Sequence, residues 1–136
     1  MKSLFRDMVR WSSCFGTLAL LASPASATSN MFCDGIDSGV EVNILFGAGP
    51  VLTIIDVTLS TETQYFSTQK RDGATPAWIA RDFADDDMVK VDLIDDQASD
   101  LIASIRVVRS DDEEPYQIGY VQLTGSPTMG VTCVGP

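Results

Sequence analysis

Aspartates are concentrated between residues 85 and 100, where their spacing could bind a cation. Carboxylates held close together repel one another unless a cation lies between them, and Ca²⁺ takes six to eight oxygen ligands. The other interpretation is two solvated loops whose charges keep the protein soluble. Solvated loops are favoured, because neighbouring side chains along a strand point to opposite faces and these carboxylates cannot all converge on one ion. The aspartates concerned are Asp85, Asp86, Asp87, Asp92, Asp95, Asp96 and Asp100.

The sequence offers little for catalysis. It contains no histidine, which removes the commonest general base and the commonest zinc ligand. The segment Gly47–Pro50 lacks the lysine and the serine or threonine of a phosphate-binding loop, and no Gly-x-Ser-x-Gly sequence is present. We therefore expect a binding protein and not an enzyme.

The N-terminal residues predict export. Three basic residues within the first ten precede the short apolar stretch Cys14–Ala22, and small residues follow it. This order predicts a signal peptide over residues 1–27, cleaved after Ala27. The apolar stretch is shorter than the roughly 20 residues that span a bilayer. We expect a mature chain without a transmembrane anchor, located in a bacterial periplasm or secreted. The periplasm is favoured because the sequence has no Asn-x-Ser/Thr glycosylation site.

Residues 28–136 are expected to form a single domain. Removing 27 of the 136 residues leaves 109, an ordinary size for a domain with its own core. Two cysteines remain, Cys33 and Cys133, near opposite ends of this segment. In an oxidising compartment such a pair predicts one disulfide that ties the ends together.

The mature chain is strongly acidic. The signal peptide carries three of the nine basic residues and one of the nineteen acidic residues, which leaves six basic, eighteen acidic and a net charge of −12. Nucleic acids are poor partners for such a surface, because phosphate binding depends on clustered Lys and Arg. Anionic lipid is disfavoured for the same reason. Cations and basic proteins are the partners that this field attracts.

Hydrophobic periodicity predicts an all-β protein. Short apolar runs with a period of two, separated by Gly, Pro, Asn and Asp, predict about eight strands and no helix. Val40, Val42, Ile44 and Phe46, for example, share one face of a strand. So many short strands predict an antiparallel two-sheet β-sandwich, in which each sheet covers one face of the other. A closed barrel is the competing all-β architecture.

Three aromatic residues are candidates for recognition. Trp78 lies among apolar residues and is expected in the core, with an exposed binding anchor as the alternative. Tyr116 and Tyr120 share one face of a predicted strand, and we expect them to pack across strands before serving as a binding platform. The acidic run 111–115 is expected at a hairpin tip.

Several segments of this chain resemble C2 domains, which are eight-stranded antiparallel sandwiches. Val40–Phe46 followed by Leu52–Asp56 looks like the opening strand and first loop of that family. Glu62–Phe66 and Thr75–Trp78 are similar to its Asp-Pro-Tyr-Val-like segment and its Asn-Pro-x-Trp turn. Val89–Ala103 looks like its third strand-loop-strand unit, with spaced aspartates in the loop.

The resemblance implies a calcium site between two loops at one end of the fold. Thr63 and Gln97 stand where family members carry aspartates, which would reduce the number of carboxylate ligands. The metal ligands that the resemblance implies are Asp56, Asp95, Asp96 and Asp100.

Two functions of different kinds follow. The first is an exported C2-like module whose acidic loops bind Ca²⁺ and couple the domain to a surface or protein partner. The second is a periplasmic inhibitor or adaptor that docks on a basic protein through its negative field, with lysozyme as a plausible target because it is cationic. Stability that depends on divalent ions would favour the first, and salt-sensitive protein capture without calcium would favour the second.

Overall fold

The computed structural model describes residues 28–110 and 116–136, and these residues form nine strands. The predicted signal peptide, residues 1–27, and the acidic run 111–115 lie outside the described residues. Within the described part of the chain, no helix is long and apolar enough to cross a membrane. The strands are β1 (Ser29–Gly35), β2 (Glu41–Gly47), β3 (Thr53–Ser60), β4 (Tyr65–Ser67), β5 (Thr75–Ala84), β6 (Met88–Asp95), β7 (Leu101–Ser110), β8 (Tyr116–Leu123) and β9 (Met129–Val134).

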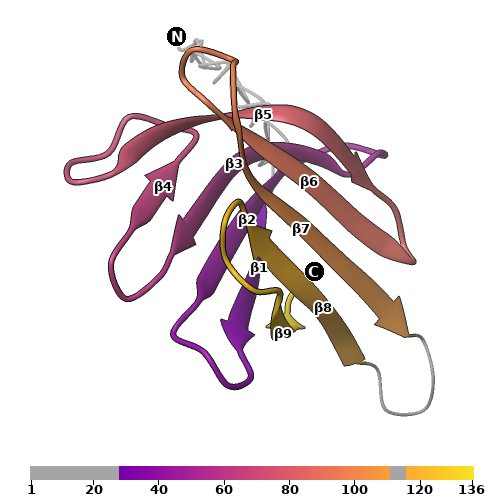
Figure 1. The fold of residues 1–136 in the computed structure, drawn as a ribbon. Coiled ribbons are helices and arrows are strands. Elements are labelled where there is room, and N and C mark those ends of the chain that lie inside the picture. The colour runs from indigo at the N-terminus through magenta and orange to yellow at the C-terminus, as the bar shows by residue number, and fades with distance from the viewer. Residues whose placement is uncertain (1–27, 111–115) are drawn as a thin grey trace, which may run out of the picture.

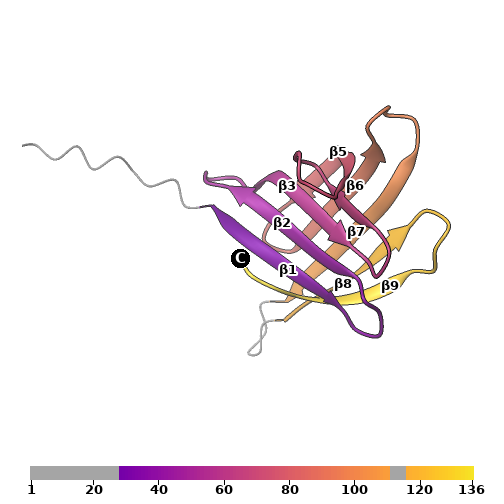
Figure 2. The same cartoon turned by 90° about the vertical axis from the view of Figure 1, so that its left-hand side faces the viewer.

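The strands close into one barrel, so the predicted two-sheet sandwich, which the resemblance to C2 domains also implied, is wrong. Each strand pairs with the next in chain order, and β9 returns to pair with β1 (Figures 1 and 2). All neighbours are antiparallel except β4 and β5, which run parallel and share only two pairs of residues. Sandwich and barrel have the same alternation of buried and exposed residues. The pairing of the first and last strands is what distinguishes them, and periodicity does not report it.

Apolar side chains fill the interior of the barrel. The alternation predicted for residues 40–46 is confirmed, since Val40, Val42, Ile44 and Phe46 are all buried. A barrel of this size is just wide enough for its side chains to fill it. The interior is therefore a packed core, and a surface for partners has to be found on the outside. Other strands contribute Met31, Val57, Leu59, Val89, Val91, Leu93, Ile105, Val107, Val121 and Val131 to this core.

A disulfide lies where the barrel closes. Cys33 of β1 and Cys133 of β9 are directly opposite each other in the ladder, with their Cα atoms 4.0 Å apart, and their sulfur atoms are bonded. Both side chains are buried. The predicted bond is thus present, and it joins the first strand to the last across a sequence separation of 100 residues.

Removing this bond should weaken the whole barrel. In the chain-entropy model, closing a loop of about 100 residues contributes about 4–5 kcal/mol, and losing a native disulfide typically costs about 2–5 kcal/mol. We expect the double variant Cys33→Ala/Cys133→Ala to lose that much free energy of unfolding in urea titration. Wild-type protein in reductant is the matched control and should behave like the variant. A loss below about 1 kcal/mol would mean that the β1–β9 ladder closes the barrel without help from the bond.

Candidate functional site

Asp56, the first of the predicted metal ligands, is engaged in an internal network. It is buried on β3, where its Oδ1 accepts a hydrogen bond of 2.7 Å from Thr68 Oγ1 and its Oδ2 pairs with Arg71 Nη2 at 2.6 Å. Thr68 Oγ1 in turn accepts a hydrogen bond from the backbone N–H of Val57. The hydrogen bond with Asp56 raises the pKa of Arg71. Asp56 therefore fastens the β4–β5 connection to β3.

Asp95 organises the turn between β6 and β7. Its Oδ2 accepts a hydrogen bond of 2.7 Å from Ser99 Oγ, and its Oδ1 accepts bonds from the backbone N–H groups of Ser99 and Asp100 at 2.7 and 3.2 Å. These bonds lower the pKa of the Asp95 carboxyl, and the bond from the Ser99 hydroxyl has the largest effect. Both oxygens thus have partners within the turn itself.

The structure brings three of the four predicted ligands into one turn and leaves the fourth elsewhere. Asp95, Asp96 and Asp100 belong to the β6–β7 turn, whereas Asp56 lies beside Arg71. In residues 28–110 and 116–136, no three acidic or cysteine side chains are arranged so that they could hold a metal ion. The calcium site stays a prediction, and the unfolding temperature with and without millimolar Ca²⁺ tests it.

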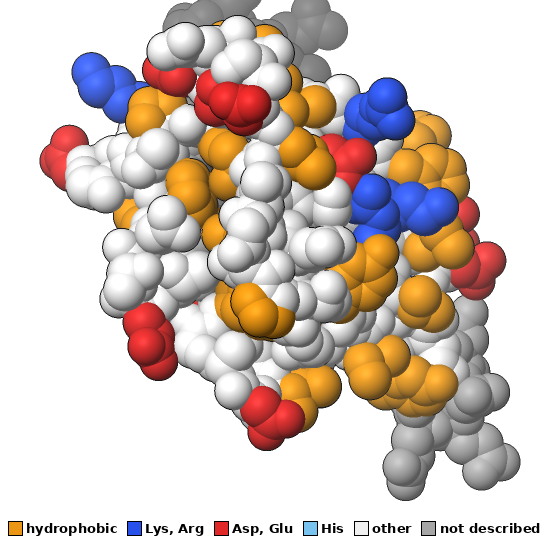
Figure 3. Space-filling view, viewed as in Figure 1, with side chains coloured by type: hydrophobic (Ala, Val, Ile, Leu, Met, Phe, Trp, Pro, Cys, Tyr) orange, Lys and Arg blue, Asp and Glu red, His pale blue; other side chains and the backbone are white. Residues whose placement is uncertain are grey.

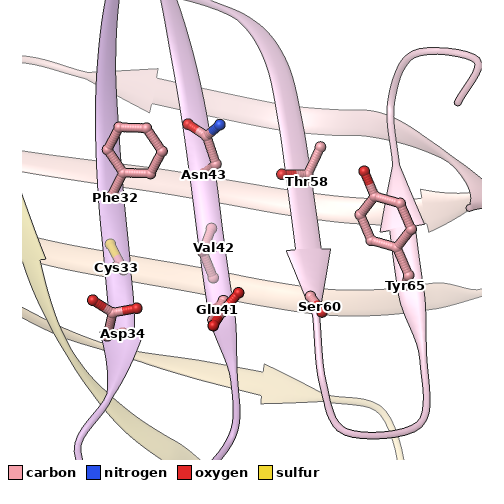
Figure 4. Close-up of a pocket in the computed structure, with 9 residues that line it drawn as sticks. All are labelled: Phe32, Cys33, Asp34, Glu41, Val42, Asn43, Thr58, Ser60 and Tyr65. Atoms are coloured by element: carbon pink, nitrogen blue, oxygen red, sulfur yellow. The ribbon is translucent and has the colours of Figure 1, made fainter.

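A hollow of about 380 Å³ opens on the outer face of β1–β4. This volume lies near the lower end of the range for small-ligand sites, about 300–1,000 Å³. Figure 4 shows side chains from all four strands on this face, with two carboxylates side by side near one end. We call it the acidic hollow, and it is lined by Phe32, Cys33, Asp34, Glu41, Val42, Asn43, Thr58, Ser60 and Tyr65.

Strand register aligns the polar side chains of the acidic hollow into two rows. One row runs Asp34, Glu41, Ser60 and Tyr65, each directly opposite the next on the neighbouring strand. The second row runs Phe32, Asn43 and Thr58 in the same way. Both rows face outward because their neighbours in sequence, such as Cys33, Val42 and Leu59, point into the core.

The two carboxylates give the acidic hollow its charge. Asp34 and Glu41 are directly opposite each other, and Cβ atoms of such pairs are about 4.5–5.5 Å apart. Both residues are exposed. Like charges in this position repel and reduce stability. A cationic group placed between them removes the repulsion, so the pair is suited to an ammonium or a guanidinium group.

Aromatic and amide groups complete the site. Phe32 on β1 is about half exposed, and Tyr65 lies three strands away on β4 (Figure 4). Aromatic ring faces attract cations. The Oδ1 atom of Asn43 is buried and accepts no hydrogen bond from the described residues. Because it is buried, this oxygen is not exposed to a ligand in this arrangement of the side chain.

Sequence reasoning missed this site because register creates it. Asp34 and Glu41 look like isolated acids in the sequence, and only the ladder between β1 and β2 shows that they are opposite each other.

The expected core position of Trp78 is wrong: its side chain is 62% exposed on β5. Its neighbours Ala77 and Ile79 face the core, so alternation along β5 turns Trp78 outward.

Comparison with protein-family models, with curated proteins and with solved structures finds no match to this chain.

The lowered pKa of Asp95 predicts a pH-dependent contribution to stability. Because the folded state favours the ionised carboxyl, the contribution is present above the unfolded pKa of about 4 and is lost as the pH falls through the lower folded value. We expect Asp95→Asn to unfold at a lower temperature than wild type at pH 7, and the difference to close towards about pH 2. Asp96→Asn, in the same turn, is the control. If the difference in unfolding temperature between the variant and wild type does not change with pH, the lost stability comes from hydrogen-bond geometry and not from charge.

Proposed function

We propose that the protein is an exported, non-enzymatic binding module that docks on a basic protein through the acidic hollow. The observation that carries this proposal is the direct opposition of Asp34 and Glu41 on the outer face of β1 and β2. Lysozyme is a suitable target class, because it is cationic and accessible in the compartment to which a signal peptide would lead.

The local chemistry of the acidic hollow fits a Lys or Arg side chain of the partner. The two carboxylates supply charge-assisted acceptors, which form the stronger class of hydrogen bond. Phe32, two residues before Asp34 on β1, adds an exposed aromatic ring to the same outer face. Charge and an aromatic ring thus occur together on one face of the sheet.

The charge of the whole chain supports the same choice of partner. The chain carries a formal net charge of −10, so its field attracts cationic proteins and accelerates their approach. The field by itself does not select an orientation. The acidic hollow does, because it combines charge with a recess of defined shape.

Binding and stability should respond in opposite directions to one substitution. Glu41→Lys replaces a repulsive cross-strand pair with an attractive one, and such pairs contribute about 0.2–1 kcal/mol. The same change places a cation where the partner's cation has to bind. We expect a slightly higher unfolding temperature together with at least a tenfold weaker affinity, the equivalent of about 1.4 kcal/mol or more.

The measurement is binding to lysozyme as a cationic probe, at about 0.05 and about 0.3 M salt. Asp96→Lys is the matched control, because it changes the net charge by the same amount in the exposed β6–β7 turn. It should retain the affinity of wild type to within about threefold. Equal losses in both variants would show attraction by net charge alone. Salt-insensitive binding, or no loss in Glu41→Lys, would remove the acidic hollow from the proposal.

A further inference from the structure

A separate row of aligned side chains crosses the outer face of β5–β8, away from the acidic hollow. Phe83, Lys90, Arg106 and Tyr120 are successive register partners on these four strands. We call this face, together with Arg81, the basic face. Figure 3 shows basic side chains among hydrophobic ones on the right-hand part of the surface, the side where Figure 1 places β5–β7.

The basic face has the opposite charge from the rest of the protein. Arg81, Lys90 and Arg106 border one hollow of about 300 Å³, together with only two acids, Asp82 and Asp92. Asp92 already pairs with Arg106 at 2.7 Å. Neither Arg81 nor Lys90 forms an ion pair within the described residues. This positive surface stands out in a chain with nineteen acidic and nine basic residues.

Packing holds the cations of the basic face in place. The Arg106 guanidinium donates hydrogen bonds to the carbonyls of Val91 and Ile105 in addition to its bond with Asp92. Lys90 Nζ lies 5.8 Å from the centroid of the Phe83 ring. The sheet thus fixes the Arg106 guanidinium, whereas exposed Lys90 lies over the Phe83 ring and stays accessible to a partner.

Exposed hydrophobic side chains flank these charges. Tyr120 and Phe83 stand at the two ends of the row, and Val108 and Ile118 are directly opposite each other next to it. All four are more than 40% exposed. Contiguous exposed apolar groups beside polar ones are typical of protein interaction sites. The partner should therefore carry both negative charge and apolar groups.

The acidic hollow of another molecule meets both requirements. Asp34 and Glu41 are direct register partners, as are Lys90 and Arg106, so the Cβ atoms of both pairs are about 5 Å apart. Exposed Phe32 borders the carboxylates, as Tyr120 borders the cations. We propose that the acidic hollow of one molecule docks on the basic face of a second copy. This inference rests on the proposed role of the acidic hollow as a cation-binding site.

The positions of the two surfaces determine the kind of assembly. Figure 2 shows β1–β3 in front and β5–β7 behind, so the two surfaces lie on opposite sides of the barrel. Each molecule can use both at once, which gives an open head-to-tail chain instead of a closed dimer. The net charge of −10 opposes association at long range. At about 0.15 M salt the screening length is about 8 Å, so contact between the complementary surfaces prevails over charges on the far side.

Sedimentation of the purified protein tests this proposal. Between about 10 µM and about 1 mM, at about 0.15 M salt, the average mass should rise above that of one chain, and about 0.5 M salt should reverse the rise. Lys90→Glu and Glu41→Lys should each weaken self-association at least tenfold. The double variant Glu41→Lys/Lys90→Glu, which exchanges the two charges, should regain it. Lys70→Glu and Asp96→Lys are controls that change net charge equally outside both surfaces and should associate like wild type.

The outcomes separate this inference from the proposed function. Lys90→Glu should bind lysozyme as wild type does, because its acidic hollow is intact. A monomeric wild type that still binds lysozyme through Glu41 would overturn the inference alone. Failure of the double variant to regain self-association would also overturn it. The inference would also fail if the protein stays monomeric and its basic face binds phosphatidylglycerol vesicles, because the partner of that face would then be lipid.

Discussion

Closure of the barrel between β1 and β9 is the constraint on which the other features depend. Four residue pairs and the Cys33–Cys133 bond join these strands. Without this junction both strands would be open edges, and the core that they cover would be exposed on one side. Closure also sets the curvature of the sheet, which places the outer faces of β1–β4 and β5–β8 on opposite sides of one small body.

A filled interior leaves recognition to the outer surface. On that surface the register of adjacent strands decides which side chains become neighbours. The same rule produces a pair of acids on one side and a pair of bases on the other. Each pair is unfavourable by itself and is favourable with an oppositely charged partner. Asp92 reduces the repulsion between the two bases by pairing with Arg106. Burial alone would raise the pKa of Asp92, but hydrogen bonds from Arg106 and Ser104 and the charges of Arg106 and Arg81 together lower it.

Most of the strands could be predicted from the sequence, but their closure into a barrel could not. Alternation correctly predicted Val42, Ile44 and Phe46 inside, and Ala103, Ile105 and Val107 alternate in the same way, whereas Leu101 is exposed where β7 begins. Strand β1 is hard to predict from the sequence, because Met31 and Cys33 are its only inward apolar side chains. Whether the strands form a sandwich or a barrel depends on contacts between residues 100 positions apart in the sequence. The acidic hollow could not be predicted either, because the register across the turn between β1 and β2 determines that Asp34 meets Glu41.

The order of the strands also determines how the chain reaches its folded state. Every pairing except one joins strands that are consecutive in sequence, so most contacts form by closing short loops at small entropic cost. The remaining pairing brings together Cys33 and Cys133, the two ends of the domain. Contacts of high sequence separation form slowly. Folding should thus begin as rapid growth of neighbouring hairpins and end with a slower circularisation of the sheet. Until that last step, β1 and β9 expose unpaired backbone to any other strand, and this is the interval in which the chain is most vulnerable to aggregation.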